Sequence, residues 1–341
     1  MSTATNNSCA IEQIMSNVAN NTCGIDFTSD QVILPVVYGF VFCIGLPTNF
    51  LALYGLYRLV KTENVLPVFV INLLLSDLLQ ISTLPFWMDY YRNIHVWNFG
   101  LGACSIIGCI FYISMFVSIF FLCCIALERY LAIVHPLWFR KYGKLRNTCL
   151  ICVGLWVFVI SVTSVAFKLG FEDAESSLCM EKYPSDRSFA VFQLVAMAIT
   201  FPLPLCFLVF LYRGIQKNIT KVISVPDEEK KRIVGLLSLI IIIFILVFGP
   251  FHLMCYVNYM GVLLFEDSCD YESRTFIYFQ FAIGLLSLNS ALDPIMYLFL
   301  RKDYRKVVIN SFPHLQRLSI WSLRLAANQA DSTSVQTAHT V

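Results

Sequence analysis

Seven long apolar runs constrain the fold of this chain more than any other feature of its sequence. They cover roughly residues 32–57, 66–90, 101–134, 148–169, 189–212, 234–264 and 276–300. Each run is long enough for a helix that crosses a bilayer, which needs about 20 residues. With 58% hydrophobic residues and 13% charged residues, the chain is too apolar for a protein whose whole surface lies in water. We therefore expect an all-α membrane protein, a bundle of seven transmembrane helices.

The positive charges beside these runs give the orientation of the bundle. Of the 24 Lys and Arg residues, all but five lie on one side, in segments such as RKYGKLR, EEKKR and RKDYRK. Those on the other side are Arg92, Lys168, Lys182, Arg187 and Arg274. Because Lys and Arg accumulate in cytoplasmic loops, the amino-terminal tail is predicted to be extracellular. The tail lacks the apolar core of a cleavable signal peptide, so the first apolar run is expected to direct insertion.

Three glycosylation sequons can be sorted by this orientation. Asn6 and Asn20 lie in the polar outer tail, where glycosylation is expected. Asn218 falls on the cytoplasmic side and is expected to stay unmodified.

The 13 cysteines divide into two groups by location. Cys9, Cys23, Cys179 and Cys269 lie outside the runs on the outer side. The others lie in or beside apolar runs, where a free cysteine packs as a small apolar residue, and Cys104 among them sits at the outer end of the third run. Oxidising conditions outside the cell allow these five outer cysteines to form disulfides.

Charged residues at two depths indicate functional sites. Glu128 and Arg129 stand at the inner end of the third run, in CCIALERYLAIVHPL, where an interfacial anchor with a snorkelling arginine is the simplest alternative. Asp77 and Asp293 lie within runs, and Asp293 precedes a proline in SALDPIMYLFL. A carboxylate at such a depth is costly and therefore usually functional.

An ordered set of motifs, one in each run, extends this pattern along the chain. The set consists of Asn49, Asp77 in NLLLSDLLQ, the Glu128–Arg129 pair, Trp156, Pro204, FGPFH and NSALDPIMY. It resembles the rhodopsin-like class of G-protein-coupled receptors, over almost the whole chain from about Leu34 to Phe312. The resemblance implies a multi-pass receptor of the plasma membrane that activates a heterotrimeric G protein, with arrestin and receptor kinases as further partners.

The resemblance also assigns roles to individual residues. It implies a disulfide between Cys104 and Cys179, and a ligand cavity that has Phe248 at its base. His252, on the same helix, either lines that cavity or is a satisfied core residue. The cytoplasmic switch comprises Glu128, Arg129, Tyr130, Tyr212 and Tyr297.

Longer motifs, including LPFWMDYY, LCMEKYP and SLNSALDPIMY, resemble the proton-sensing and lysolipid-like receptor group more closely. That resemblance implies a second disulfide between Cys23 and Cys269 and leaves the pairing of Cys9 undetermined. The chain departs from the group at places where it typically carries outer histidines, which here read Phe27, Asn93 with Ile94, and Gln280. The group's helix-four glutamate is Val159.

Asp77 and Asp293 face each other in the family's geometry, near Ser118, Asn289 and Ser290. Two neighbouring carboxylates in a poorly solvated site repel when both are ionised. We therefore expect the pair to hold either a proton or Na⁺, and the alternative is one shared proton that does not change during signalling. No other cofactor or metal is expected.

The predicted stimulus is a proton or a small lipid-like ligand, and the alternative is a lipid receptor with little proton sensitivity. An ion-coupled transporter would require repeated halves, and a retinal protein would require a lysine between Lys231 and Lys302, where there is none. Motifs of enzymes are absent, and nothing predicts binding to nucleic acid.

Four parts follow from these boundaries. They are the extracellular tail 1–31, the seven-transmembrane domain 32–300, a short eighth helix 301–312 and a cytoplasmic tail 313–341. The eighth helix resembles the amphipathic helix of the family, which lies along the membrane lipid. The cytoplasmic tail is polar and is predicted to be disordered.

Overall fold

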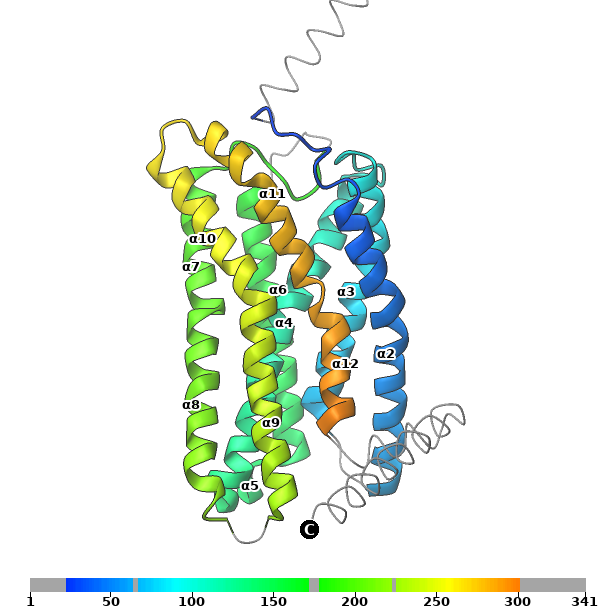
Figure 1. Cartoon of the computed structure of the whole chain (residues 1–341), viewed down its shortest axis with the longest axis vertical. Helices are drawn as coiled ribbons and strands as arrows, with labels where there is room; N and C mark the ends of the chain where they lie inside the picture. The colour runs from blue at the N-terminus through cyan, green and yellow to red at the C-terminus, as the bar shows by residue number, and fades with distance from the viewer. Residues whose placement is uncertain (1–22, 64–66, 172–177, 223–224, 301–341) are drawn as a thin grey trace, which may run out of the picture.

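The computed structural model of the chain describes residues 23–63, 67–171, 178–222 and 225–300. In this part of the chain, long helices run side by side as one bundle (Figure 1). The elements are α2 (Ile33–Glu63), α3 (Val68–Arg92), α4 (Leu101–Val134), α5 (Pro136–Tyr142), α6 (Leu145–Phe171), α7 (Arg187–Thr200), α8 (Pro202–Ile219), α9 (Asp227–Ile243), the π-helical turn η1 (Phe244–Phe248), α10 (Gly249–Leu264), α11 (Ser268–Leu286) and α12 (Asn289–Leu300).

Seven segments of these helices are long and apolar enough to cross a membrane, which confirms the seven-helix bundle. The third agrees at both ends with the predicted run, Leu101–Val134. The expected eighth helix, the cytoplasmic tail, Cys9 and the sequons Asn6 and Asn20 lie outside the described residues.

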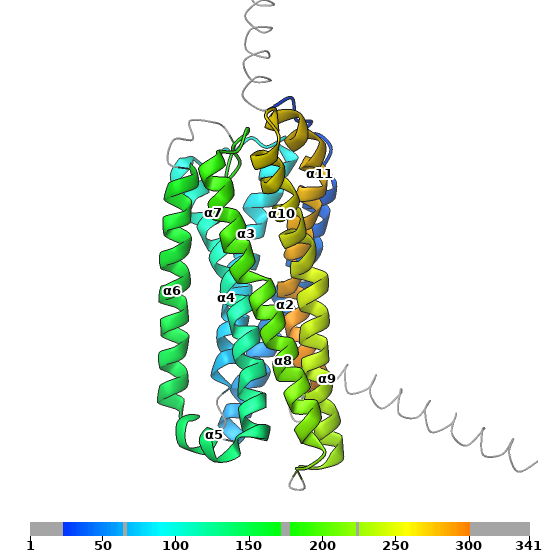
Figure 2. The same cartoon turned by 90° about the vertical axis from the view of Figure 1, so that its left-hand side faces the viewer.

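The helices differ in how deeply they are packed. In the most apolar window of α4, 61% of the residues are buried inside the protein, whereas only 17% are buried in α6. α4 therefore forms the centre of the bundle, and α6 is peripheral (Figure 2). The outer surface of α6 consists of exposed apolar side chains such as Val153 and Val157, as expected for a helix whose solvent is lipid.

Prolines interrupt three of the long segments. The fifth is broken at Phe201, before Pro202, and the sixth contains the wide turn η1 just before Pro250. In α12, Pro294 has no N–H to donate to the carbonyl of Ser290. The side-chain amide of Asn49, on α2, donates to that carbonyl instead, at 2.7 Å. This bond ties the first membrane segment to the last.

Candidate functional site

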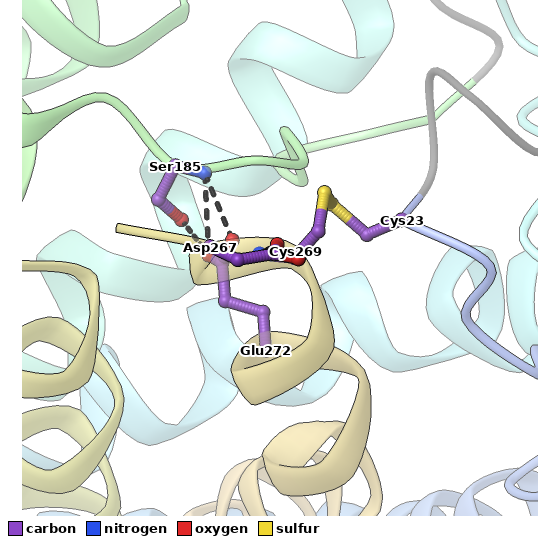
Figure 3. The surroundings of a disulfide bond; sticks show 5 residues. All are labelled: Cys23, Ser185, Asp267, Cys269 and Glu272. Atoms are coloured by element: carbon purple, nitrogen blue, oxygen red, sulfur yellow. Dashed lines mark hydrogen bonds between the residues drawn. A yellow bond between two sulfur atoms is a disulfide. The ribbon is translucent and has the colours of Figure 1, made fainter. Parts of the chain in front are cut away.

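Two disulfide bonds fasten the outer segments to the bundle. Cys104, at the outer end of α4, is bonded to Cys179. Cys23, in the tail, is bonded to Cys269 in the first turn of α11 (Figure 3). These are the two pairs that the family resemblance implies. They hold the tail and the loop after α6 over the outer end of the helices.

A wholly buried histidine, His95, joins these outer segments. Its Nδ1 lies 2.7 Å from a carboxylate oxygen of Glu181, and its Nε2 lies 3.1 Å from both carboxylate oxygens of Asp30. The Tyr90 hydroxyl donates to Glu181 at 3.0 Å, and the Gln280 amide donates to the other oxygen of Glu181 at 2.6 Å. Four segments therefore meet around this imidazole: the tail, the outer end of α3, the loop before α7, and α11.

The electrostatics of this cluster keep His95 charged. Burial alone lowers the pKa of the imidazole, but the charge of Glu181 and the hydrogen bonds to Asp30 and Glu181 outweigh it and raise the pKa to about 9. The ring therefore carries a positive charge throughout the physiological range. The charge of a histidine held in this way does not change on mild acidification. We call this arrangement, His95 between Asp30 and Glu181, the clamp.

The replaced histidine positions surround this clamp. The ring centroid of Phe27 lies 4.6 Å from that of His95, and Gln280 contacts Glu181. Asn93 ends the preceding helix, and Ile94 and His95 both have φ in the left-handed region, at 54° and 57°. That conformation is unfavourable for a β-branched residue such as Ile94, so the contacts of His95 must stabilise the turn.

A cavity of about 280 Å³ lies below these outer segments. Its walls are mainly aromatic and aliphatic, and they come from α4, α6, α7, α10 and α11 and from the loop before α7. Val159 lines it, at the position where the related group carries glutamate.

Phe248 and His252 are not among the side chains that line this cavity, so the placing of Phe248 at the base of the ligand cavity stays a prediction. His252 is a satisfied core residue, the second of the two readings open from the sequence. Its Nδ1 lies 2.7 Å from the carbonyl oxygen of Phe248, and its Nε2 lies 3.2 Å from the hydroxyl of Thr200. Since Thr200 lines the cavity, the histidine supports the wall from behind.

Asp77 and Asp293 are both fully buried in the bundle, close enough to each other to interact. The amide of Asn289 donates to one oxygen of Asp293 at 3.0 Å. Both carboxylate oxygens of Asp77 and the second oxygen of Asp293 have no hydrogen-bond partner among the described residues. Oxygens buried in this way require a proton, a cation or water.

The serines expected beside this pair bond elsewhere. The hydroxyl of Ser118 lies 3.0 Å from that of Ser76, and the hydroxyl of Ser290 donates to the side-chain oxygen of Gln80 at 2.7 Å. In the described contacts, therefore, Asn289 supports Asp293 directly, and the two serines bond to other groups.

Residues 48–297 match the family described as 7 transmembrane receptor (rhodopsin family). The chain belongs to this family of receptors. Similar proteins include G-protein coupled receptor 68 of Bos taurus, 33% identical over 293 residues that cover 84% of this chain and 80% of the relative. G-protein coupled receptor 65 of Homo sapiens is 31% identical over 286 residues, 81% and 85% of the two chains. G-protein coupled receptor 183 of Homo sapiens is 28% identical over 314 residues, 89% and 87%.

The receptor is therefore a multi-pass protein of the plasma membrane that signals through a G protein and is not an enzyme. On its cytoplasmic side, Arg129 contacts the carboxylate of Glu128 at 3.2 Å, and both side chains are partly exposed. Tyr130 packs against α8, where a Cβ at Gly214 would lie 2.5 Å from its ring. A larger residue at this position would require the Tyr130 ring to shift.

Of the other two tyrosines assigned to the receptor's switch, only Tyr212 has a described side chain. The Tyr212 hydroxyl accepts from the side chains of Gln216, at 2.7 Å, and Ser238, at 3.2 Å. No contact between Tyr212 and Arg129 occurs among the described interactions. Tyr297 lies in α12, but its side chain is outside the described residues.

Reasoning from the sequence did not identify the contacts of His95 with Glu181 and Asp30, and it also missed Thr163 and Glu272 in the cavity wall. The bridge from Cys23 to Cys269 places the tail above α11, and this was the one available signal that Asp30 lies close to the outer loops.

The clamp predicts a loss of receptor stability at alkaline pH. Because the folded-state pKa of His95 is raised from 6.5 to about 9, its stabilisation is fully present below pH 6.5 and is lost as the pH rises through 9. The shift corresponds to roughly 3 kcal/mol. The melting temperature of purified receptor should fall more steeply between about pH 7.5 and pH 10 for the wild type than for His95→Gln. Parallel curves would contradict the clamp.

Proposed function

We propose that this receptor responds to a small lipid-like ligand bound in the outer cavity. The observation that carries the proposal is the lining of the cavity, about 280 Å³ of space bounded mainly by aromatic and aliphatic side chains. Sites for small molecules are concave and mostly apolar, with a few placed polar groups. Binding there shifts the helices between two arrangements, and the cytoplasmic face passes the change to the heterotrimeric G protein.

The clamp supports a lipid-like ligand over direct sensing by outer histidines. His95 stays charged over the physiological range, and the other outer positions at which the related group carries histidine hold Phe27, Asn93, Ile94 and Gln280. None of these four side chains titrates near neutral pH. Arrestin and receptor kinases are proposed as the further cytoplasmic partners.

A matched pair of alanines on α7 tests the proposal. Ala196 lines the cavity, whereas Ala198 is exposed and does not. We expect Ala196→Phe to remove second-messenger responses to a fractionated lipid extract while surface expression persists, and Ala198→Phe to respond like the wild type. Equal responses from the two variants would refute the cavity as the ligand site.

The buried carboxylates favour acid as a second stimulus. The unpartnered oxygens of Asp77 and Asp293 lead us to propose a proton or Na⁺ between them. Because two ionised carboxylates repel, uptake of either cation stabilises the pair. Asparagine at position 293 keeps the shape of the side chain but removes one charge.

This second stimulus predicts a specific result in a pH titration of second-messenger output. A residual acid response in the wild type should disappear in Asp293→Asn and Asp77→Asn, with surface expression retained. A full, steep response near neutral pH that survives Asp293→Asn would instead assign the response to the outer acids, such as Asp89, Glu172 or Glu181.

A further inference from the structure

Glu272 is a buried carboxylate at the outer end of the cavity. Glu272 is only 1% exposed. Its carboxylate accepts a hydrogen bond from the hydroxyl of Ser185 at 2.5 Å (Figure 3). It also accepts from the Ser185 N–H, whose nitrogen lies 3.2 Å from both carboxylate oxygens. Within the part of the chain that the structure describes, none of the ion pairs includes Glu272. A buried negative charge without a cation is strongly unfavourable.

Two cations of the outer segments are already paired with other carboxylates, and Arg187, which follows Ser185 by two residues, is exposed and belongs to none of the described ion pairs. Lys182 lies 2.7 Å from Asp186, and Arg274 lies 3.0 Å from Asp270. His95 is held by Asp30 and Glu181. The negative charge of Glu272 is therefore left for a group that comes from outside the protein.

The walls next to Glu272 suit an ammonium group. Tyr183, Tyr259 and Phe276 line the same cavity as Glu272, and the ring centroids of Tyr183 and Phe276 lie 6.1 Å apart at 74°. Aromatic faces attract cations, and cages of such rings recognise quaternary ammonium groups. A carboxylate among aromatic rings combines both attractions in one place.

A second polar group lies on α6, at another part of the wall. The hydroxyl of Thr163 is buried, and it has no hydrogen-bond partner among the described residues. The residue is only 6% exposed. A buried hydroxyl is costly when unpaired, so this one is available to a polar atom of the ligand below the head group.

The remainder of the cavity leads to the lipid-facing surface. Phe158 and Val162 of α6 and Ile199 of α7 line the cavity, yet they are 55%, 45% and 50% exposed. Side chains that face both the cavity and the surroundings mark an opening between α6 and α7. From Phe158 to Phe167, the wall formed by α6 extends for about 14 Å along the helix axis.

We propose that the cavity takes a single-chain amphiphile with an ammonium head group from the outer leaflet of the membrane. The head group lies beside Glu272, and the apolar chain passes between α6 and α7 into lipid. This assignment rests on the proposed function, because it names the chemical class of the ligand for the same cavity. The negative charge of Glu272 favours a positively charged head group. The exposed apolar wall residues Phe158, Val162 and Ile199 favour an apolar chain.

Binding of a defined probe to purified receptor tests the proposal. Radiolabelled tetradecyltrimethylammonium and uncharged tetradecyl maltoside are compared, below their micellar concentrations, on receptor in nanodiscs of uncharged galactolipid. We expect Glu272→Gln, which keeps the shape of the side chain and an oxygen acceptor, to weaken ammonium binding by at least about 10-fold. Binding of the maltoside should not change.

Two pairs of variants separate the head group, the chain and the loop. Val162→Trp should weaken both probes by closing the passage, whereas Val157→Trp, at an exposed α6 residue outside the cavity wall, should affect neither. Ser185→Ala removes the hydroxyl partner of Glu272 but keeps the negative charge. It should retain the preference for ammonium, which excludes the loop contact as the cause of the Glu272→Gln effect.

The outcomes distinguish this inference from the proposed function. Equal loss of both probes in Glu272→Gln, or no preference for ammonium in the wild type, would overturn the head-group assignment and leave the proposed function standing. If neither probe binds the wild type, the inference fails. The proposed function fails with it only if Ala196→Phe also leaves the lipid response intact.

Discussion

Replacing Arg129 with alanine is expected to abolish activation of the G protein while leaving the receptor folded at the cell surface. Arg129 lies at the inner end of the central helix α4, and its only described ion pair is with its neighbour Glu128, at 3.2 Å. The side chains are 38% and 27% exposed. Partly exposed pairs of this kind contribute about 1 kcal/mol or less to stability, so the loss should appear in coupling and not in folding.

Nucleotide exchange on the G protein and antibody labelling of intact cells measure the two properties separately. Arg140→Ala is a suitable control, because Arg140 is an exposed cation in α5 on the same face of the membrane. It should activate the G protein as well as the wild type does. Normal nucleotide exchange by Arg129→Ala would remove the assignment of Arg129 to the switch.

Replacing Cys104 or Cys179 with alanine is expected to prevent the receptor from reaching the cell surface in a folded form. The bond closes a loop across 75 residues, and both half-cystines are buried. Loss of such a bond typically costs about 2–5 kcal/mol. The damage also spreads, because the N–H of Cys179 donates to the Tyr90 hydroxyl, which in turn donates to Glu181 of the clamp.

Surface labelling and thermal melting of solubilised receptor measure this loss. The double variant should be no worse than either single variant, since both remove the same bond. Cys43→Ala changes an exposed free cysteine and should have little effect, and replacement of Cys9 should also cost far less. Alkylation of both Cys104 and Cys179 in signalling receptor would show that the bond is dispensable.

The features that could be predicted from the sequence are those with a local cause. A run of apolar residues specifies a membrane helix by itself, so the ends of the third segment agree with the structure at Leu101 and Val134. The start of the seventh segment was less predictable. α11 begins at Ser268, eight residues before the predicted apolar run. Its first residues are polar, and the side chain of Asp267 caps the start of the helix by accepting a hydrogen bond from the Cys269 N–H.

The parts that could not be predicted depend on residues far apart in the chain. His95 and Asp30 are separated by 65 positions, and Glu272 meets Ser185 across 87. Nothing in the local pattern shows that these charges are buried, because their burial results from the way the loop before α7 folds over the bundle. His252 is a further example, since its position beside Pro250 fits a cavity residue and a core residue equally well, and its two hydrogen bonds place it in the core.

The π-helical turn η1 divides the sixth membrane segment into an inner half that reaches the cytoplasm and an outer half that reaches the ligand side. A turn of this kind carries one residue more than an α-helical turn, and one residue corresponds to about 100° of rotation around the axis. If that surplus residue is absorbed, the inner half turns as a unit and presents a different set of side chains to the cytoplasm, while the hydrogen bonds within each half are kept. A change confined to Phe244–Phe248 would thus alter the helical phase of the whole inner half.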